Sequence, residues 1–387
     1  MKILKIVIYL FIIIGGLFFI NQRVNVFPLN DYLQYWSAVQ INLARQNPYD
    51  ADQMYAIQLT QGWQAPSAIM MWNPPMTIGL MLPFGILPYS ISRLAYFFFS
   101  IIVALLVGDQ TWQIYGGPNS VRWLGILLVI TFGPMLQLFK LGQIDTWGLI
   151  GIIGFLLFIR RKDYFFAGLM ASLTLVKPHM VYLFWMALFF WTIVKRSWTI
   201  WIGVSIGLMI PLAIAWVTNP NVVNQYLYAM TTSPPQQWIT ATIGSRLRLI
   251  FGPEYFYLQF LPTILGGLIF IIYFAKRYRS WTWEQELPGV ILGSIATASY
   301  GWIFDISLGV VAVIALGAVI ALRMKKHFSL NSLPKPVIVL SILYLVISFS
   351  LGFISAQYHE LWMAGSAIFL LYLCFQIWIP VKAFEAG

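Results

Sequence analysis

The amino-acid sequence predicts an all-α membrane protein that crosses the bilayer many times. Hydrophobic residues make up 60% of the 387-residue chain and charged residues 9%, so too little polar surface exists to cover a soluble domain. The mean hydropathy is correspondingly high, at +0.79. The apolar residues form about twelve segments whose lengths approach the ~30 Å thickness of a bilayer core. These observations predict a single integral membrane domain over residues 1–387.

The predicted spans occupy most of the chain. The N-terminal segment has the basic start and apolar core of a signal peptide, but its long apolar run and the lack of a cleavage motif favour a first span. The segments lie near residues 4–20, 91–108, 122–139, 144–159, 164–177, 180–194, 198–217, 257–275, 287–301, 303–322, 336–354 and 361–380.

The basic residues indicate how these spans are oriented. The net charge is +11, and the charges stand in short clusters between apolar segments, a pattern that sets membrane topology rather than binding nucleic acid. With all clusters in the cytoplasm, both termini are cytoplasmic, and outer loops at 21–90 and 218–256 face the outside or periplasm of a multi-pass plasma-membrane protein. The clusters lie at residues 2–5, 160–162, 195–196, 276–279, 323–326 and 382.

Residues 74–89 are apolar enough to resemble a further span. A crossing here would place every later basic cluster outside the cell, which contradicts the positive-inside tendency. The prolines in this stretch and its shortness also argue against a regular membrane helix. We therefore predict a re-entrant or interfacial helix on the outer face.

The first outer loop carries three carboxylates, Asp31, Asp50 and Asp52. Asp31 begins a predicted helix with an aromatic stripe that includes Tyr35. The local sequence leaves two roles open for Asp31: a helix cap paired with Gln34, or a general base that accepts a proton from an attacking hydroxyl. Asp50 and Asp52 are more typical of a turn and the cap of the next helix.

Positive charge is scarce on the predicted outer face, because basic residues are normally retained inside. A lysine at the end of a span either extends its ammonium group to the interface or contacts a ligand. Several cations around a cavity at membrane level are typical of a site for a phosphate group carried on a lipid. The candidate phosphate ligands are Lys177, Arg93, Lys140, Arg246 and Arg248.

Asp305 stands at the outer start of a late span, close to Tyr300 and Trp302. It either pairs with an outer cation or binds sugar hydroxyls, and the sequence leaves both interpretations open. No metal-binding or nucleotide-binding motif is present, and the single cysteine, Cys374, provides no thiolate cluster. The sequence therefore predicts neither a metal site nor a cofactor, and no nucleic-acid partner.

Five sequence blocks resemble a known family. They are DYLQYWSAVQINLARQNPYD, WNPPMTIGLMLPFGILP, LGQID, AGLMASLTLVKPH and SYGWIFDISL, in this order over residues 31–310. They are similar to blocks of the bacterial polyprenyl-phosphate-mannose-dependent α-mannosyltransferases, which belong to the GT-C superfamily. The resemblance implies a GT-C-like fold of about 12 transmembrane helices with additional outer helices. It also implies a membrane glycosyltransferase of the cell envelope that uses a polyprenyl-phosphate sugar donor.

The resemblance further implies roles for individual residues. Asp31 would be the general base for inverting transfer of a sugar, mannose in this family, to a lipid or glycan acceptor. Lys177 would lie near the donor phosphate, and Gln143 and Asp305 would line the substrate cavity. The other predicted cavity residues are Tyr35, Asp145, His179 and Trp302.

Two other functions fit a protein with many spans. A lipid-carrier flippase or transporter would explain the buried polar residues, but it predicts inverted repeats that the sequence does not show. A non-catalytic subunit of an envelope-polymer assembly machine would keep the polar motifs as structural contacts. A shared location of Asp31, Lys177 and Asp305 would favour the enzyme over both alternatives.

Overall fold

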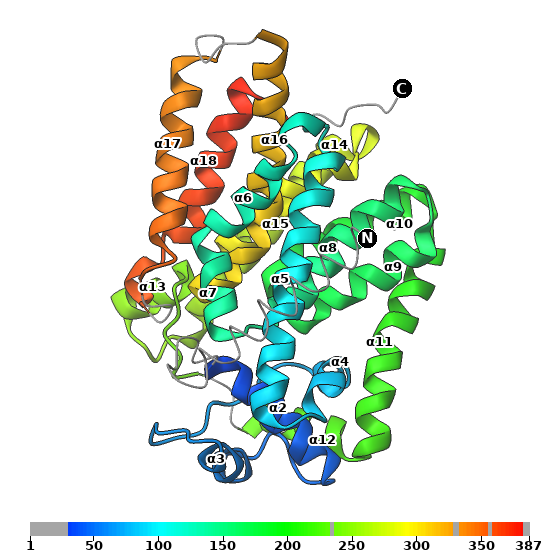
Figure 1. The fold of residues 1–387 in the computed structure, drawn as a ribbon, viewed down its shortest axis with the longest axis vertical. Coiled ribbons are helices and arrows are strands. Elements are labelled where there is room, and N and C mark those ends of the chain that lie inside the picture. Colours follow the sequence, from blue (N-terminus) through cyan, green and yellow to red (C-terminus); the bar gives the residue numbers. More distant parts are fainter. Residues whose placement is uncertain (1–29, 233–235, 328–332, 355–357, 382–387) are drawn as a thin grey trace, which may run out of the picture.

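The computed structural model describes residues 30–232, 236–327, 333–354 and 358–381, and it contains helices but no strand within them. The all-α prediction is therefore confirmed for this part of the chain. The predicted first span at 4–20 and the basic residues at 2–5 and 382 lie outside the described residues. Long helices run along the long axis of the molecule, and short helices gather at its lower end (Figure 1).

The helices fall into two groups along the chain, and the first group runs from residue 30 to residue 218. Its members are α2 (Asn30–Leu43), α3 (Ala51–Thr60), α4 (Met76–Gly85), α5 (Tyr89–Ile114), α6 (Trp123–Thr131), α7 (Gly133–Leu141), α8 (Asp145–Arg160), α9 (Tyr164–Ser172), α10 (Tyr182–Lys195) and α11 (Thr199–Thr218). The second group is α12 (Val222–Thr232), α13 (Ile243–Phe251), α14 (Leu261–Arg277), α15 (Trp283–Thr297), α16 (Val310–His327), α17 (Lys335–Ser350) and α18 (Ala364–Trp378). Short 3-10 segments join them at η1 (Asn119–Val121), η2 (Leu173–Val176), η3 (Pro178–Val181), η4 (Phe256–Gln259), η5 (Tyr278–Ser280), η6 (Ile303–Gly309) and η8 (His359–Leu361).

The predicted spans that lie in the described residues coincide mainly with these helices. Six of the described helices are long and apolar enough to cross a bilayer, or seven if one bent pair forms a single span. The structure thus agrees with a polytopic membrane protein, whereas the count of about twelve crossings stays a prediction. The segment Ile303–Met324, which joins η6 to α16, is the most buried of the six and lies inside the bundle.

Residues 122–139, predicted as one span, form two helices that together are long and apolar enough for one broken span. α6 and α7 are bent by 69° relative to each other. Pro134 lies in the first turn of α7, where its missing N–H costs no helical hydrogen bond. Gly133 packs tightly against α17, since an added Cβ would lie 2.0 Å from the backbone oxygen of Ser348. The bend lets α7 leave the direction of α6 before the chain reaches Gln143.

Residues 74–89 contain the short helix α4, and α5 begins at the last of them. The 10 residues of α4 extend about 15 Å, roughly half of a bilayer core, so this helix cannot cross by itself. Gly79 on α4 packs against α11 so closely that a Cβ there would lie 1.9 Å from the Pro211 oxygen. This contact fixes α4 to the bundle next to α2.

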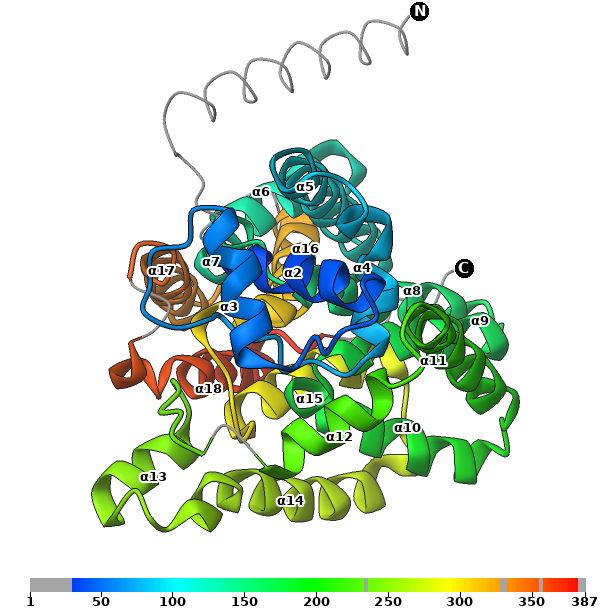
Figure 2. The ribbon, with the colours of Figure 1, turned by 90° about the horizontal axis from the view of Figure 1, so that it is seen from below.

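The two predicted outer loops lie at the same end of the molecule. In Figure 1, α2, α3, α4 and α12 gather at the lower end, and Figure 2 shows α2 and α3 across the middle of that end. Trp72 and Trp238 join the two loops by an edge contact with ring centroids 5.9 Å apart. Asn42 on α2 also donates a hydrogen bond of 3.0 Å to the backbone oxygen of Ala215 on α11.

α5 and α8 lead from this end to the opposite one. α5 begins beside α2 and has 26 residues, which extend about 39 Å. The two helices finish together, because Arg160 at the end of α8 donates a 2.8 Å hydrogen bond to the Ile114 oxygen at the end of α5. The basic cluster at 160–162 is therefore far from the end that carries α2.

Candidate functional site

α2 places Asp31 because the aromatic side of the helix is buried. Tyr32 stacks on Tyr96 of α5 with ring centroids 4.9 Å apart, and its hydroxyl is hydrogen-bonded to Ser92. Trp36 donates a 2.9 Å hydrogen bond from its indole N–H to the Leu87 oxygen. The aromatic stripe predicted from the sequence thus packs on the bundle, and it fixes the rotation of α2 about its axis.

Asp31 lies in the first turn of α2, and its side chain is half-buried. Its Oδ2 accepts a hydrogen bond from the side-chain amide of Gln143, not from the backbone of Gln34 as a capping box would require. Its Oδ1 accepts no hydrogen bond from the described residues. Burial raises the pKa of Asp31 to about 6, although the Gln143 hydrogen bond and the charge of Lys177 act in the opposite direction.

Lys177 is the centre of the cluster that adjoins Asp31. It lies between η2 and η3, where Pro178 prevents a continuous helix. Its ammonium Nζ donates hydrogen bonds to Asp145 Oδ2 at 2.7 Å, Asp305 Oδ1 at 2.5 Å and Gln143 Oε1 at 3.1 Å. Only 11% of the side chain is exposed, and these three acceptors use all three of its donors.

The two carboxylates on Lys177 come from the ends of different helices. Asp145 is fully buried at the start of α8, where the partial positive charge of the helix N-terminus favours an anion. Asp305 lies in η6, and its Oδ2 accepts a 2.7 Å hydrogen bond from the Trp302 backbone N–H. Lys177 therefore contacts two buried carboxyl groups, and Asp31 adds a third carboxyl group nearby.

Gln143 connects this cluster to α2. Gly142 ends α7 in the left-handed conformation, with φ of 70°, and so turns the chain toward the start of α8. The Gln143 side-chain oxygen accepts hydrogen bonds from Lys177 and, at 3.0 Å, from the Tyr35 hydroxyl. Its backbone oxygen accepts a 2.9 Å hydrogen bond from the hydroxyl of Tyr96. The block LGQID thus supplies a tight turn and two cluster residues, Gln143 and Asp145.

The structure brings together most of the residues predicted for the cavity. Asp31, Tyr35, Gln143, Asp145, Lys177 and Asp305 form one hydrogen-bonded cluster, and Trp302 is attached through its backbone. His179 is half-buried two residues after Lys177 and makes no side-chain hydrogen bond to the described residues. Within the described residues, no group of three or more His, Cys, Asp or Glu side chains has the geometry to hold a metal ion.

The other predicted phosphate ligands lie outside this cluster. Arg93 is half-buried at the start of α5 with its guanidinium 5.7 Å from the centre of the Tyr89 ring, and its buried Nε has no hydrogen-bond partner among the residues that the structure describes. Lys140 is exposed on α7. Arg248 is buried and donates to backbone oxygens of its own loop, including a 2.6 Å bond to Gln236, and Arg246 is half-buried on the same helix, α13.

Of the two carboxylates that the sequence assigned to a turn and a helix cap, Asp50 has that role. Asp50 caps α3, accepting a 2.9 Å hydrogen bond from the Gln53 backbone N–H. Asp52 is exposed in the first turn of the same helix. Neither contacts the Lys177 cluster.

Two residues that position the cluster had no distinctive signal in the sequence. Tyr96 is one of several aromatic residues in an apolar span, so its contact with Gln143 was not predictable. Asn73 donates a 2.8 Å hydrogen bond to the Val176 oxygen and thereby ties the first outer loop to the turn before Lys177. Asn73 stands next to a proline pair in a polar stretch, which is the only sequence feature that marks it.

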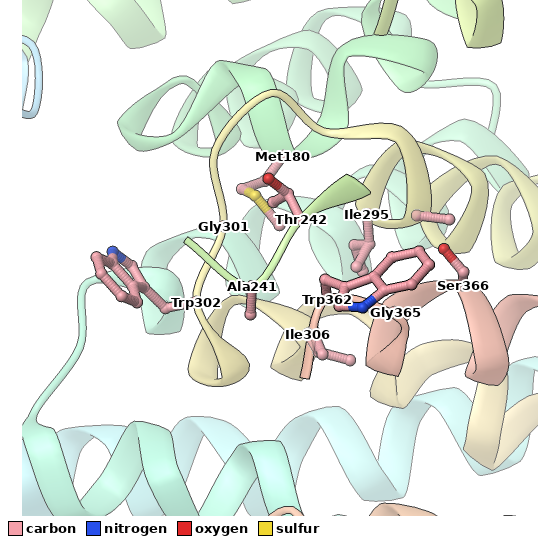
Figure 3. A pocket seen from close by; sticks show the side chains of 11 residues that line it. Met180, Ala241, Thr242, Ile295, Gly301, Trp302, Ile306, Trp362, Gly365 and Ser366 are labelled. Atoms are coloured by element: carbon pink, nitrogen blue, oxygen red, sulfur yellow. The ribbon is translucent and has the colours of Figure 1, made fainter. Parts of the chain in front are cut away.

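A small pocket lies beside the turn that carries Asp305. Met180, Trp302, Ile306 and Trp362 are among its lining residues, and the Trp302 indole points away from the others (Figure 3). Its volume of about 10 Å³ is close to that of one water molecule and too small for a sugar. A larger pocket of about 410 Å³ lies beside Arg248, in the segment 218–256 that was predicted as an outer loop. Asp31 lines neither of them.

Comparison with known proteins supplies a family for this arrangement. The sequence model of glycosyltransferase family 87 matches residues 72–348, which is more than half of the chain and includes Gln143, Lys177 and Asp305. Searches of curated proteins and of solved structures found no match. The chain belongs to glycosyltransferase family 87, and it is a glycosyltransferase.

Proposed function

We propose that this protein transfers a sugar from a polyprenyl-phosphate donor to a lipid or glycan acceptor at the outer face of the plasma membrane. Mannose is the sugar implied by the sequence resemblance. Asp31 is the general base in this proposal. The main support is the state of its carboxylate: Gln143 holds Oδ2, and Oδ1 accepts no hydrogen bond from the described residues. One oxygen is thus fixed, and the other is available to an acceptor hydroxyl.

The reaction follows from this arrangement. Asp31 Oδ1 takes the proton of the acceptor hydroxyl, and the hydroxyl oxygen forms a bond to the anomeric carbon of the donor sugar. The bond from that carbon to the phosphate oxygen breaks, and its electron pair leaves with the polyprenyl phosphate. Attack from the face opposite the phosphate inverts the anomeric configuration. Polyprenyl phosphate is a stable anion, so its departure needs no general acid.

The donor phosphate requires a cation with free donors. Lys177 donates to two carboxylates and an amide, and a phosphate approaching it would meet the negative charge of Asp145 and Asp305. Arg93 instead has an Nε without a hydrogen-bond partner in the described part of the chain, and it adjoins α2 through Tyr89, whose ring is 6.3 Å from that of Tyr32. A guanidinium group with free donors suits a phosphate. We therefore propose Arg93, rather than Lys177, as the main phosphate ligand.

Charge and helix direction support the proposed orientation. The basic cluster at 160–162 is separated from α2 by the length of α5 and α8. Under the positive-inside tendency, that end belongs in the cytoplasm, and the end with Asp31 faces the outside or periplasm. With about twelve crossings, both termini are cytoplasmic. We extend this proposal to the whole chain as one integral membrane domain of GT-C-like architecture.

The two alternative functions lose their basis. A flippase or transporter does not account for membership in a glycosyltransferase family. A non-catalytic subunit does not account for that membership either, and it gives no reason for one Asp31 oxygen to accept no hydrogen bond from the described residues.

The test is sugar transfer by the purified protein in lipid. The protein is incubated with labelled polyprenyl-phosphate mannose and a lipid and glycan extract of its host, and labelled products are separated. We expect a labelled product from wild type and a rate about 10² to 10⁴ lower from Asp31→Asn. The matched control is Asp52→Asn, which removes an exposed carboxylate of the same loop and leaves the rate unchanged. Near wild-type transfer by Asp31→Asn would overturn the role of Asp31, and transfer from other donors alone would overturn the proposed donor.

A further inference from the structure

The orientation of the Gln143 amide is set by charged groups on both sides. Its oxygen faces the ammonium group of Lys177, which can only donate hydrogen bonds. Its nitrogen faces the carboxylate of Asp31, which can only accept them when ionised. A flipped amide would place N–H against the ammonium group and oxygen against the carboxylate. Both charged neighbours therefore favour the same orientation.

Tyr35 adds a second donor to the same oxygen. Its hydroxyl donates a 3.0 Å hydrogen bond to Gln143 Oε1, and Tyr35 itself is buried on α2, one helical turn after Asp31. Gln143 is only 2% exposed, so water has little access to its side-chain oxygen. The amide is thus held by two donors on one side and directed at Asp31 on the other.

We propose that Gln143 is a positioning residue that holds the Asp31 carboxylate in its reactive orientation. Lys177 and Tyr35 act through it, by fixing the direction of its amide. This inference rests on the proposed role of Asp31 as the base. Gln143 contacts Asp31 through Oδ2 only, so it orients the carboxylate while leaving Oδ1 open to the acceptor.

The arrangement also connects the cluster charge to Asp31. Lys177 contacts the amide and not Asp31 itself, so the amide dipole carries the influence of the cation across the gap. The hydrogen bond from Gln143 favours the ionised form of Asp31 and lowers its pKa against the effect of burial. Loss of the amide should therefore both misorient the base and keep it protonated to a higher pH.

Other titratable groups lie on the elements around α2 and have to be considered when a pH profile of activity is interpreted. α4 and α11, which pack on α2, carry no titratable side chain. The titratable and charged groups that remain on the elements around α2 are Asp52 and Tyr55 on α3, Tyr89, Arg93, Tyr96 and Asp109 on α5, Lys140 on α7, Tyr32 and Tyr35 on α2 itself, and Asp145, Lys177, His179 and Asp305 in the adjoining cluster.

The experiment compares pH profiles of kcat/KM for sugar transfer in three variants. Gln143→Met removes the amide and keeps the length of the side chain. Tyr35→Phe removes one donor to the amide oxygen without touching Asp31. Tyr55→Phe is the matched control, because it deletes a hydroxyl on the neighbouring helix α3 that donates to the Ala65 oxygen and lies outside the cluster.

We expect the acid limb of the profile to move to higher pH by about one unit in Gln143→Met, the size expected for loss of a hydrogen bond to a charged group. Tyr35→Phe should move it by a smaller amount in the same direction, with an unchanged KM for the donor. The Tyr35→Phe shift should disappear when Gln143 is already methionine, since its effect passes through the amide. Tyr55→Phe should leave the acid limb where wild type has it.

Either of two results would overturn the positioning role of Gln143. In the first, the acid limb does not move in Gln143→Met; in the second, the Tyr35→Phe shift persists in the double variant. Asp31→Asn, measured in parallel, separates this failure from failure of the proposed function. If Asp31→Asn abolishes transfer while Gln143→Met leaves the limb unmoved, Asp31 remains the base and the inference about Gln143 is wrong. Tyr35→Phe provides a readout even where Gln143→Met does not fold.

Discussion

Lys177 and Asp305 are 128 residues apart in the sequence, yet Lys177 Nζ donates a 2.5 Å hydrogen bond to Asp305 Oδ1. Asp145 accepts a second bond from the same ammonium group, at 2.7 Å. One buried cation thus holds the start of α8 and the turn η6 together. Because the carboxylates outnumber the cation, the cluster depends on this lysine for its stability.

The first prediction concerns that dependence. Lys177→Met leaves Asp145 and Asp305 buried without a counter-charge, and breaking a buried ion pair in this way costs about 3–5 kcal/mol. We expect a clear fall in the midpoint of thermal unfolding in detergent. Lys140→Met removes an exposed lysine and should change stability by no more than about 0.5 kcal/mol. A raised KM for the donor with unchanged stability would instead identify Lys177 as a phosphate ligand.

The second prediction concerns pH. The pKa of Asp31 in the folded protein is about 6, above the ordinary carboxyl value of 3.8, so the carboxyl takes up a proton as the pH falls through 6. A protonated Asp31 cannot act as a base, and kcat/KM should therefore fall about tenfold per unit below pH 6. The profile of kcat/KM between about pH 4.5 and 8 tests this, because that range covers the titration on both sides of the Asp31 pKa. An activity that is flat to about pH 4.5 would contradict the assignment.

The third prediction concerns the donor. Arg93→Gln removes a guanidinium group whose Nε has no partner in the described residues, so the fold should lose little. We expect the KM for the polyprenyl-phosphate donor to rise by about tenfold or more, since a charged hydrogen bond to phosphate is lost. Arg45→Gln removes the same charge from an exposed position after α2 and is the control. Equal KM values for the two variants would exclude Arg93 as the phosphate ligand.

The fourth prediction concerns the support of α2. In Gly79→Ala the new Cβ would lie 1.9 Å from the Pro211 oxygen, and backbone cannot move aside as a flexible side chain can. α4 must then separate from α11, at a cost of about 1–3 kcal/mol. Gly267→Ala on α14 is the control, because the nearest atom to its Cβ would be Met186 Sδ at 3.6 Å. The measurement is the midpoint of thermal unfolding of each variant. Equal midpoints would mean that the α4–α11 contact is not tight.

Composition and local pattern were sufficient for the class of this protein and for most of its helices. A chain this apolar has to bury its surface in a bilayer, and each span is encoded by a continuous run of residues. The cap formed by Asp50 was predictable for the same reason, since a cap depends on the next three residues. The 69° bend between α6 and α7 was not, because Pro134 inside an apolar run indicates a kink or a break without fixing its angle, and Gly133 meets α17 only in the folded chain.

The sequence by itself determined that Asp31, Gln143, Lys177 and Asp305 are unusual polar residues in an apolar chain, because charge at membrane depth is costly wherever it lies. Only the tertiary structure decided their partners. In the folded chain Lys177 donates hydrogen bonds to Asp145 and Asp305. Asp31 accepts a hydrogen bond from Gln143 rather than from the backbone of its own helix. The physical reason is distance along the chain: these contacts join residues 32 to 128 positions apart, and local sequence holds no information on which of them meet.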